Sequence, residues 1–137
     1  MSAIDESRSF IPVNIAVMTI SDTRKLSDDK SGDLLVQRLD DAGHKLAARV
    51  IIRDEVAEIT AQLSHYIDDE AIDCVIATGG TGLTGRDVTP EAFRRVFDKE
   101  IEGFGEMFRF LSFQKIGTST LQSRAVAGVS GGTYLFA

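Results

Sequence analysis

The sequence predicts an α/β fold, namely a three-layer domain with a mostly parallel sheet, helices on both faces and a C-terminal β-hairpin. Apolar, β-branched runs alternate with amphipathic helical segments through residues 13–97, which is typical of parallel βαβ units with right-handed crossovers. A Ser-Gly-Gly turn at residues 130–132 separates the last two apolar runs, which indicates a hairpin. The length of 137 residues fits one domain with a core of its own.

The first half of the chain predicts two strand-helix pairs. Residues 13–20 are almost entirely apolar, which predicts a strand buried on both faces of a parallel sheet. Ser31 is interpreted as the N-cap of a helix that closes at Gly43. Residues 46–52 predict a second strand, and a helix follows it because apolar residues recur at helical spacing. These residues are Val56, Ile59, Leu63, Tyr66 and Ile67.

The second half predicts a third strand at residues 72–78, a glycine-rich loop and a helix from about Pro90 to Phe97. Thr89 before Pro90 indicates an N-cap with proline at the first helical position. A Phe-rich helix then begins at about Phe104. The closing hairpin is predicted over residues 125–129 and 133–137.

The domain is predicted to span residues 13–137 after an N-terminal extension over residues 1–12. The chain stops at the end of a strand, where a three-layer domain normally adds a loop and a covering helix. We therefore expect either that the hairpin ends the domain or that the sequence is truncated there.

The segment TGGTGLTGRDVTPEA at residues 78–92 predicts a phosphate site. It leads from a strand into a helix N-terminus, where backbone N–H groups and the helix dipole favour an anion. Its glycines at positions 79, 80, 82 and 85 can take positive φ and let the backbone approach a ligand. An ordinary strand-to-helix turn remains the alternative, because the segment lacks the lysine of a P-loop.

Three aspartates follow the three predicted strands: Asp22, Asp54 and Asp87. The ligand crevice of an open α/β sheet lies beyond the C-terminal ends of its strands, so the topology brings these carboxylates to one edge. Carboxylates beside a phosphate loop are a common way to hold Mg²⁺. The alternative is that each aspartate only caps a turn.

Composition narrows the classes of function. The net charge of −6 argues against a general nucleic-acid or anionic-membrane binder. The opening residues do not form a secretory signal, and the apolar run at residues 13–20 is too short for a membrane span. The single Cys74 lies in an apolar run and is interpreted as a small buried residue. These features favour a cytoplasmic protein.

Several motifs together resemble the MoaB/Mog family of molybdopterin-binding proteins over essentially the whole chain. Residues 101–128 are most similar to the B-type branch of that family. The motifs are the glycine loop, SD at 21–22, KSG at 30–32, RDE at 53–55, GFGEMFR at 103–109 and TSTLQSRAVAG at 118–128. Arg53 replaces a proline that often precedes the aspartate in the family.

The resemblance implies a domain that binds molybdopterin and, in the catalytic branch, transfers AMP from ATP to its terminal phosphate with Mg²⁺. It implies that Asp54 and Asp87 are the catalytic and metal-binding residues. Arg86 is a candidate phosphate clamp, because its fork binds two oxygens at once. The alternative is that Arg86 is a solvated charge on the loop. The expected substrate-binding residues are Ser21, Asp22, Ser31, Gly32, Thr78, Gly79, Gly80, Thr81, Gly82, Arg86, Glu106 and Ser119.

The resemblance also implies trimeric units, and therefore a homotrimer or homohexamer that works with other molybdenum cofactor biosynthesis proteins. The Phe-rich region at residues 104–113 offers more apolar surface than one helix of a small domain needs to bury. A non-catalytic binder or carrier of molybdopterin is an alternative function, because function depends on the site rather than on the fold. A plain oligomeric assembly module is a further alternative.

Overall fold

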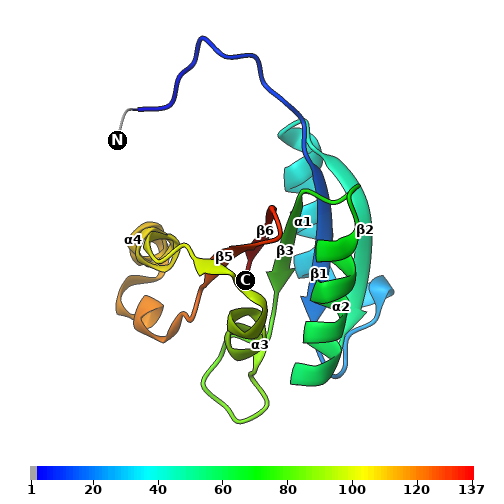
Figure 1. Ribbon diagram of the computed structural model, residues 1–137. Coiled ribbons are helices and arrows are strands. Elements are labelled where there is room, and N and C mark those ends of the chain that lie inside the picture. The colour runs from blue at the N-terminus through cyan, green and yellow to red at the C-terminus, as the bar shows by residue number, and fades with distance from the viewer. Residues whose placement is uncertain (1–2) are drawn as a thin grey trace.

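The computed structural model describes residues 3–137, so residues 1 and 2 of the predicted N-terminal extension lie outside the described residues. Six strands form one sheet in the order β2-β1-β3-β6-β5-β4. Figure 1 shows how the elements follow one another. Their bounds are β1 Asn14–Ile20, η1 Leu26–Asp28, α1 Lys30–Asp41, β2 Lys45–Ile52, α2 Val56–Asp68, β3 Cys74–Thr78, α3 Thr89–Val96, β4 Lys99–Glu100, α4 Gly103–Ile116, η2 Gly117–Gln122, β5 Ala127–Ser130 and β6 Thr133–Phe136.

The sheet is mixed, as predicted. Strands β2, β1, β3 and β6 run parallel to one another, whereas β5 is antiparallel to β6 and β4 is antiparallel to β5. The long parallel part puts the C-terminal ends of β1, β2 and β3 at one edge, where a ligand crevice is expected. The hairpin of β5 and β6 is confirmed. Gly131 and Gly132 both have positive φ, of 57° and 86°, as a type I′ turn requires.

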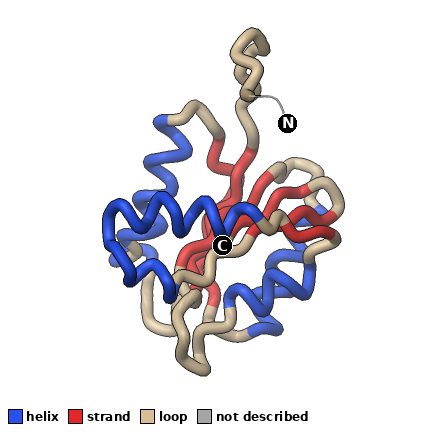
Figure 2. The backbone as a smooth tube through the Cα atoms, turned by 90° about the vertical axis from the view of Figure 1, so that its left-hand side faces the viewer, coloured by secondary structure: helices blue, strands red, loops and turns tan. Residues whose placement is uncertain are grey.

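Helices cover both faces of the sheet, which confirms the three-layer prediction (Figure 2). Alternate residues of β1 point to opposite faces. Met18 joins a core cluster with Ile59 of α2 and Phe93 of α3, whereas Val17 joins a second cluster with Leu39 of α1. Helix α4 lies on the same side as α1, because Phe104 packs against Phe136 of that second cluster, with ring centroids 5.3 Å apart.

Several predicted boundaries differ from the structure. The third strand begins at Cys74 rather than at Ile72, because the Ile72 N–H donates to the Asp69 carbonyl and closes a turn. Cys74 is buried as predicted, and this burial raises the pKa of its thiol to about 11. The short strand β4 at the sheet edge was not predicted, since two residues carry no periodicity.

Both predicted helix caps are wrong by one or two residues. The N-cap of α1 is Asp29, whose carboxylate accepts the Gly32 N–H at 3.0 Å, and Ser31 lies inside the helix. The N-cap of α3 is Val88. The Thr89 hydroxyl instead donates to the Gly79 carbonyl at 2.9 Å. A competing tertiary contact therefore decides the role of this threonine.

Candidate functional site

The glycine loop is held tightly against the end of β1. Gly79 and Gly80 have φ of 92° and 67°. A Cβ atom at Gly79 would lie only 2.2 Å from the Ile20 carbonyl oxygen, and one at Gly80 would lie 2.1 Å from Thr89 Oγ1. These two positions therefore need glycine both for conformation and for space. Gly82 and Gly85 do not adopt positive φ, so the conformational demand is confined to the first part of the loop.

Asp54 lies beside this tight part of the loop. Its Oδ1 atom is buried and has no hydrogen-bond partner among residues 3–137. A Cβ atom at Gly80 would come within 2.6 Å of the same oxygen. Burial raises the pKa of Asp54 above its ordinary value, and the charges of Asp22 and Asp87 raise it further. An unpaired, partly desolvated carboxylate is costly to keep ionised, and such groups concentrate at functional sites.

Asp22 and Arg86 form the outer part of the same edge. The Asp22 carboxylate accepts the Asp54 N–H at 3.1 Å and two hydrogen bonds from Arg86 Nη2 at 3.0 Å. The hydrogen bonds from Arg86 hold the pKa of Asp22 below its usual range. Arg86 also donates to Glu55 at 2.9 Å. The arginine predicted as a phosphate clamp is therefore bound to carboxylates that follow β1 and β2.

Asp87 caps a turn within the glycine loop. Its Oδ2 accepts the Thr84 N–H at 2.9 Å and the Thr84 hydroxyl at 2.6 Å. These hydrogen bonds lower the pKa of Asp87. The turn-capping alternative is thus observed for this residue. The Asp87 carboxylate stays ionised, and its negative charge raises the pKa of Asp54. Asp87 can therefore cap the turn and also contribute a negative charge to the site.

The sequence predicted that three carboxylates meet at this edge, and the family resemblance implied that two of them, Asp54 and Asp87, hold a metal ion. Within the described part of the chain, no three His, Cys, Asp or Glu side chains are grouped so that they could hold a metal. Asp22 is instead paired with Arg86. The orphaned Oδ1 of Asp54 fits a hard cation, and Mg²⁺ needs only one or two protein oxygens. A site based on Asp54 with Asp87 nearby therefore remains compatible with magnesium.

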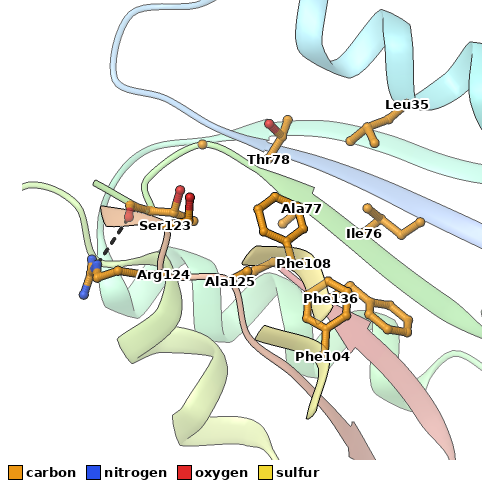
Figure 3. A pocket seen from close by; sticks show the side chains of 13 residues that line it. Leu35, Ile76, Ala77, Thr78, Phe104, Phe108, Ser123, Arg124, Ala125 and Phe136 are labelled. Carbon is orange, nitrogen blue, oxygen red and sulfur yellow. Dashed lines mark hydrogen bonds between the residues drawn. The ribbon is translucent and has the colours of Figure 1, made fainter. Parts of the chain in front are cut away.

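A pocket of about 320 Å³ opens beside the glycine loop, between α1 and α4 (Figure 3). Apolar side chains form most of its wall, and Phe104 and Phe108 project into it from α4. Polar groups gather at the end near the loop. The lining residues are Leu35, Ile76, Ala77, Thr78, Gly79, Thr81, Phe104, Phe108, Ser123, Arg124, Ala125, Phe136 and Ala137. An apolar cavity with a few polar groups at one end is the usual form of a small-molecule site.

Only part of the predicted substrate-binding set lines this pocket, namely Thr78, Gly79 and Thr81. Ser21 and Asp22 line a second hollow of about 470 Å³, on the side of β2. Ser31 and Gly32 lie in the first turn of α1. Gly80, Gly82 and Arg86 belong to the glycine loop but do not line the apolar pocket. Glu106 and Ser119 are exposed and lie outside both hollows.

Asp29 is a structural residue of the site that the sequence analysis missed. It is fully buried and accepts hydrogen bonds from Thr19 at 2.7 Å and from Arg49 at 3.1 Å. Burial raises its pKa, but the hydrogen bonds from Thr19, Gly32 and Arg49 lower it more, so the pKa lies below its ordinary value. Asp29 lies three residues before Gly32, and an aspartate at this spacing from a helix N–H is typical of an N-cap. This pattern could have identified Asp29 from the sequence. Asp29 ties the loop after β1 to α1 and β2.

The pocket walls were also missed in part, because Leu35 comes from α1 and Phe136 from β6. Ser123 and Arg124, from the segment after η2, line the pocket as well. Apolar spacing predicts that such residues are buried, but it does not predict which helices face one another. None of the helices within residues 3–137 combines the length and the apolar character needed to cross a membrane.

The fold and the site define an α/β ligand-binding domain, with an apolar pocket and a glycine loop at the C-terminal ends of parallel strands. A family model described as "Probable molybdopterin binding domain" matches residues 16–136. The chain belongs to this family, which confirms the resemblance seen in the sequence.

Curated relatives support the assignment. The chain is 50% identical over 131 residues to molybdenum cofactor biosynthesis protein B of Escherichia coli strain K12, covering 96% of this chain and 77% of that protein. It is 45% identical over 125 residues to the protein of the same name from Bacillus subtilis strain 168, covering 90% and 74%.

Solved structures agree with the fold. A crystal structure of molybdenum cofactor biosynthesis protein B superposes with a TM-score of 0.90 at 42% identity and covers 94% of this chain and 81% of that one. The tungsten cofactor synthesizing protein MoaB from Pyrococcus furiosus has a TM-score of 0.81 at 33% identity, with coverage of 93% and 82%.

Proposed function

We propose that the protein acts in molybdenum cofactor biosynthesis by binding molybdopterin and transferring AMP from ATP to its terminal phosphate. The observation that carries this proposal is the unpaired, buried Asp54 oxygen beside a glycine loop that borders an apolar pocket. The flat face of a pterin ring can pack against the apolar wall of the pocket, and the loop suits a phosphate. The names of the relatives support the biosynthetic role. The cytoplasmic location favoured by the composition stays a prediction.

The chemistry requires little covalent work from the protein. The terminal phosphate of molybdopterin attacks the α-phosphorus of ATP, and pyrophosphate leaves. Alignment and charge neutralisation supply most of the catalysis in such transfers. The pocket between α1 and α4 would orient the ring system and exclude water around it, while the backbone of Gly79 to Thr81 would face the phosphate.

Asp54 and Asp87 are the residues that would hold Mg²⁺ or its waters. The ion would supply charge neutralisation between the two anionic substrates. Arg86 contributes differently in this proposal. Its ion pairs with Asp22 and Glu55 are exposed, with 59% of the arginine side chain accessible, and exposed pairs are weak. A polyphosphate can therefore draw Arg86 away and occupy its fork.

An assay of pyrophosphate release that depends on both ATP and molybdopterin tests the proposal. We expect Asp87→Asn to slow this release by about 100-fold, because it removes a charge at the site. The asparagine oxygen can still accept from Thr84, so the loop keeps its turn. Binding without turnover by the wild-type protein, or unchanged turnover of the variant at saturating Mg²⁺, would favour the carrier alternative instead.

We also propose that the protein forms a homotrimer or a homohexamer. Helix α4 carries large apolar side chains that are about half exposed or more, namely Met107, Phe108, Phe110, Leu111, Phe113 and Ile116. Several large apolar side chains exposed together on one helix are typical of an interaction site.

We expect Phe110→Glu to convert the oligomer into monomers in analytical ultracentrifugation, because a buried unpaired charge disrupts an apolar interface. Leu34→Glu on α1 is the matched control, since Leu34 is also half exposed but lies on another helix. Sedimentation of the wild-type protein as a monomer at micromolar concentration would reject the proposal.

A further inference from the structure

Arg124 is bound to both ends of the outer part of the glycine loop, residues 81–87. Its Nε donates to the Thr81 carbonyl at 3.3 Å (dashed in Figure 3), and its Nη2 donates to the Asp87 carbonyl at 2.8 Å. Its Nη1 pairs with Glu91 in the first turn of α3. The guanidinium thus bridges the loop backbone at Thr81 and Asp87, and 26% of the Arg124 side chain is accessible.

Neither end of the loop is held there by regular secondary structure. The bonds of Arg124 go to main-chain carbonyls, so they fix the path of the backbone whatever side chains the loop carries. Only a planar fork with donors on separate nitrogens can reach two carbonyls and a carboxylate at once. A lysine at this position would keep the charge but would lose the simultaneous contacts.

Arg124 also connects the loop to the wall of the apolar pocket. Its neighbours Ser123 and Ala125 line that pocket, and the Ser123 carbonyl accepts a hydrogen bond from Arg109 of α4 at 3.2 Å. The chain of contacts therefore runs from α4, through the pocket wall, to the glycine loop. Arg124 therefore links the backbone of the glycine loop to the segment that lines the pocket.

We propose that Arg124 is a positioning residue that holds the glycine loop in register with the apolar pocket, with Glu91 orienting its guanidinium. Only the expected effect of Arg124 on turnover rests on the function proposed above. Its effect on the loop is a property of the free protein and can be measured without any ligand.

Hydrogen-deuterium exchange of the ligand-free protein tests the positioning. The loop contains three amides with partners that depend on its shape: Thr84, Asp87 and Thr89, which donate to Asp87, Thr84 and Gly80 respectively. In Arg124→Gln we expect peptides covering these amides to exchange about tenfold faster or more, since local protection follows local opening. Arg124→Lys should be intermediate.

Arg94→Gln is the matched control. Arg94 lies on α3, the helix that carries Glu91, and like Arg124 it makes an ion pair with a carboxylate, Glu100, at 2.8 Å. Glu100 lies in β4, outside the glycine loop. This variant should leave loop exchange unchanged. Unchanged loop exchange in Arg124→Gln, or an equal acceleration throughout the sheet, would overturn the positioning role.

Chemical rescue distinguishes positioning from general destabilisation. Guanidinium at millimolar concentration, well below denaturing levels, should restore loop protection in Arg124→Ala by entering the vacated space. In the pyrophosphate assay, we expect Arg124→Ala to lower kcat by a larger factor than it raises the KM for ATP. Added guanidinium should recover part of this lost kcat. A failure of guanidinium to restore protection would count against the proposal. Slow loop exchange in a wild-type protein that does not turn over would leave the positioning intact and reject only the enzymatic function.

Discussion

Gly79→Ala is expected to lower the free energy of unfolding by about 2 to 5 kcal/mol, the largest effect of any single methyl group at this site. The new Cβ would lie 2.2 Å from the Ile20 carbonyl oxygen at the end of β1, and the residue would have to keep a φ of 92°. The atom in the way is main chain in the central part of the sheet, so it cannot rotate aside. The strain must spread to the loop, to β1 or to both.

Gly85→Ala provides the control within the same loop. Gly85 has no positive φ, and a Cβ there would meet nothing within 4 Å. We expect its free energy of unfolding to stay within about 1 kcal/mol of wild type. Chemical denaturation of both variants measures the difference. Equal stabilities for the two would show that the first glycine is not constrained as described.

Asp54→Asn is expected to slow adenylyl transfer by about 100-fold or more while leaving the folded protein at least as stable as wild type at neutral pH. The asparagine keeps the shape of the side chain but removes its negative charge. In wild type this charge is shared by the buried Oδ1 of Asp54, which has no hydrogen-bond partner among the described residues. Loss of activity without loss of stability is the mark of a group kept for function rather than for folding.

The pH dependence of stability tests the same residue independently of activity. The folded-state pKa of Asp54 is raised above its ordinary value of 3.8, chiefly by burial. Its contribution is therefore fully favourable below that ordinary value and is lost as the pH rises through the raised pKa. The Asp54→Asn variant has no carboxyl group to ionise at this position, so it does not lose stability in this way as the pH rises. The stability of the variant relative to wild type should thus increase from acid to neutral pH.

Denaturation curves at several pH values measure this difference, and Asp40→Asn serves as the control. Asp40 is an exposed carboxylate on α1, away from the glycine loop. A stability difference between Asp54→Asn and wild type that is the same at all pH values would contradict the raised pKa. Full adenylyl transfer by the variant would remove Asp54 from the catalytic assignment.

The sequence by itself determined the order and type of the main elements. Residues 13–20 predicted a strand buried on both faces, and the structure confirms it as β1. The reason is local, because hydrophobic period follows from the geometry of the helix and the strand. The linked motifs likewise determined the family, which the match over residues 16–136 confirms. The position of the glycine loop, between β3 and α3, was also correct.

The tertiary structure alone decided how the site is assembled. Arg86 bonds to Asp22, 64 positions away in the chain, and Arg124 bonds to Thr81, 43 positions away. Strand order sets which loops lie side by side, and periodicity contains no information on that order. The pairing of α1 with α4 around the pocket and the burial of an unpaired Asp54 oxygen depend on it as well. Local spacing identifies charged and apolar residues, but only packing across the sheet determines which charges are neutralised and which are left for a ligand.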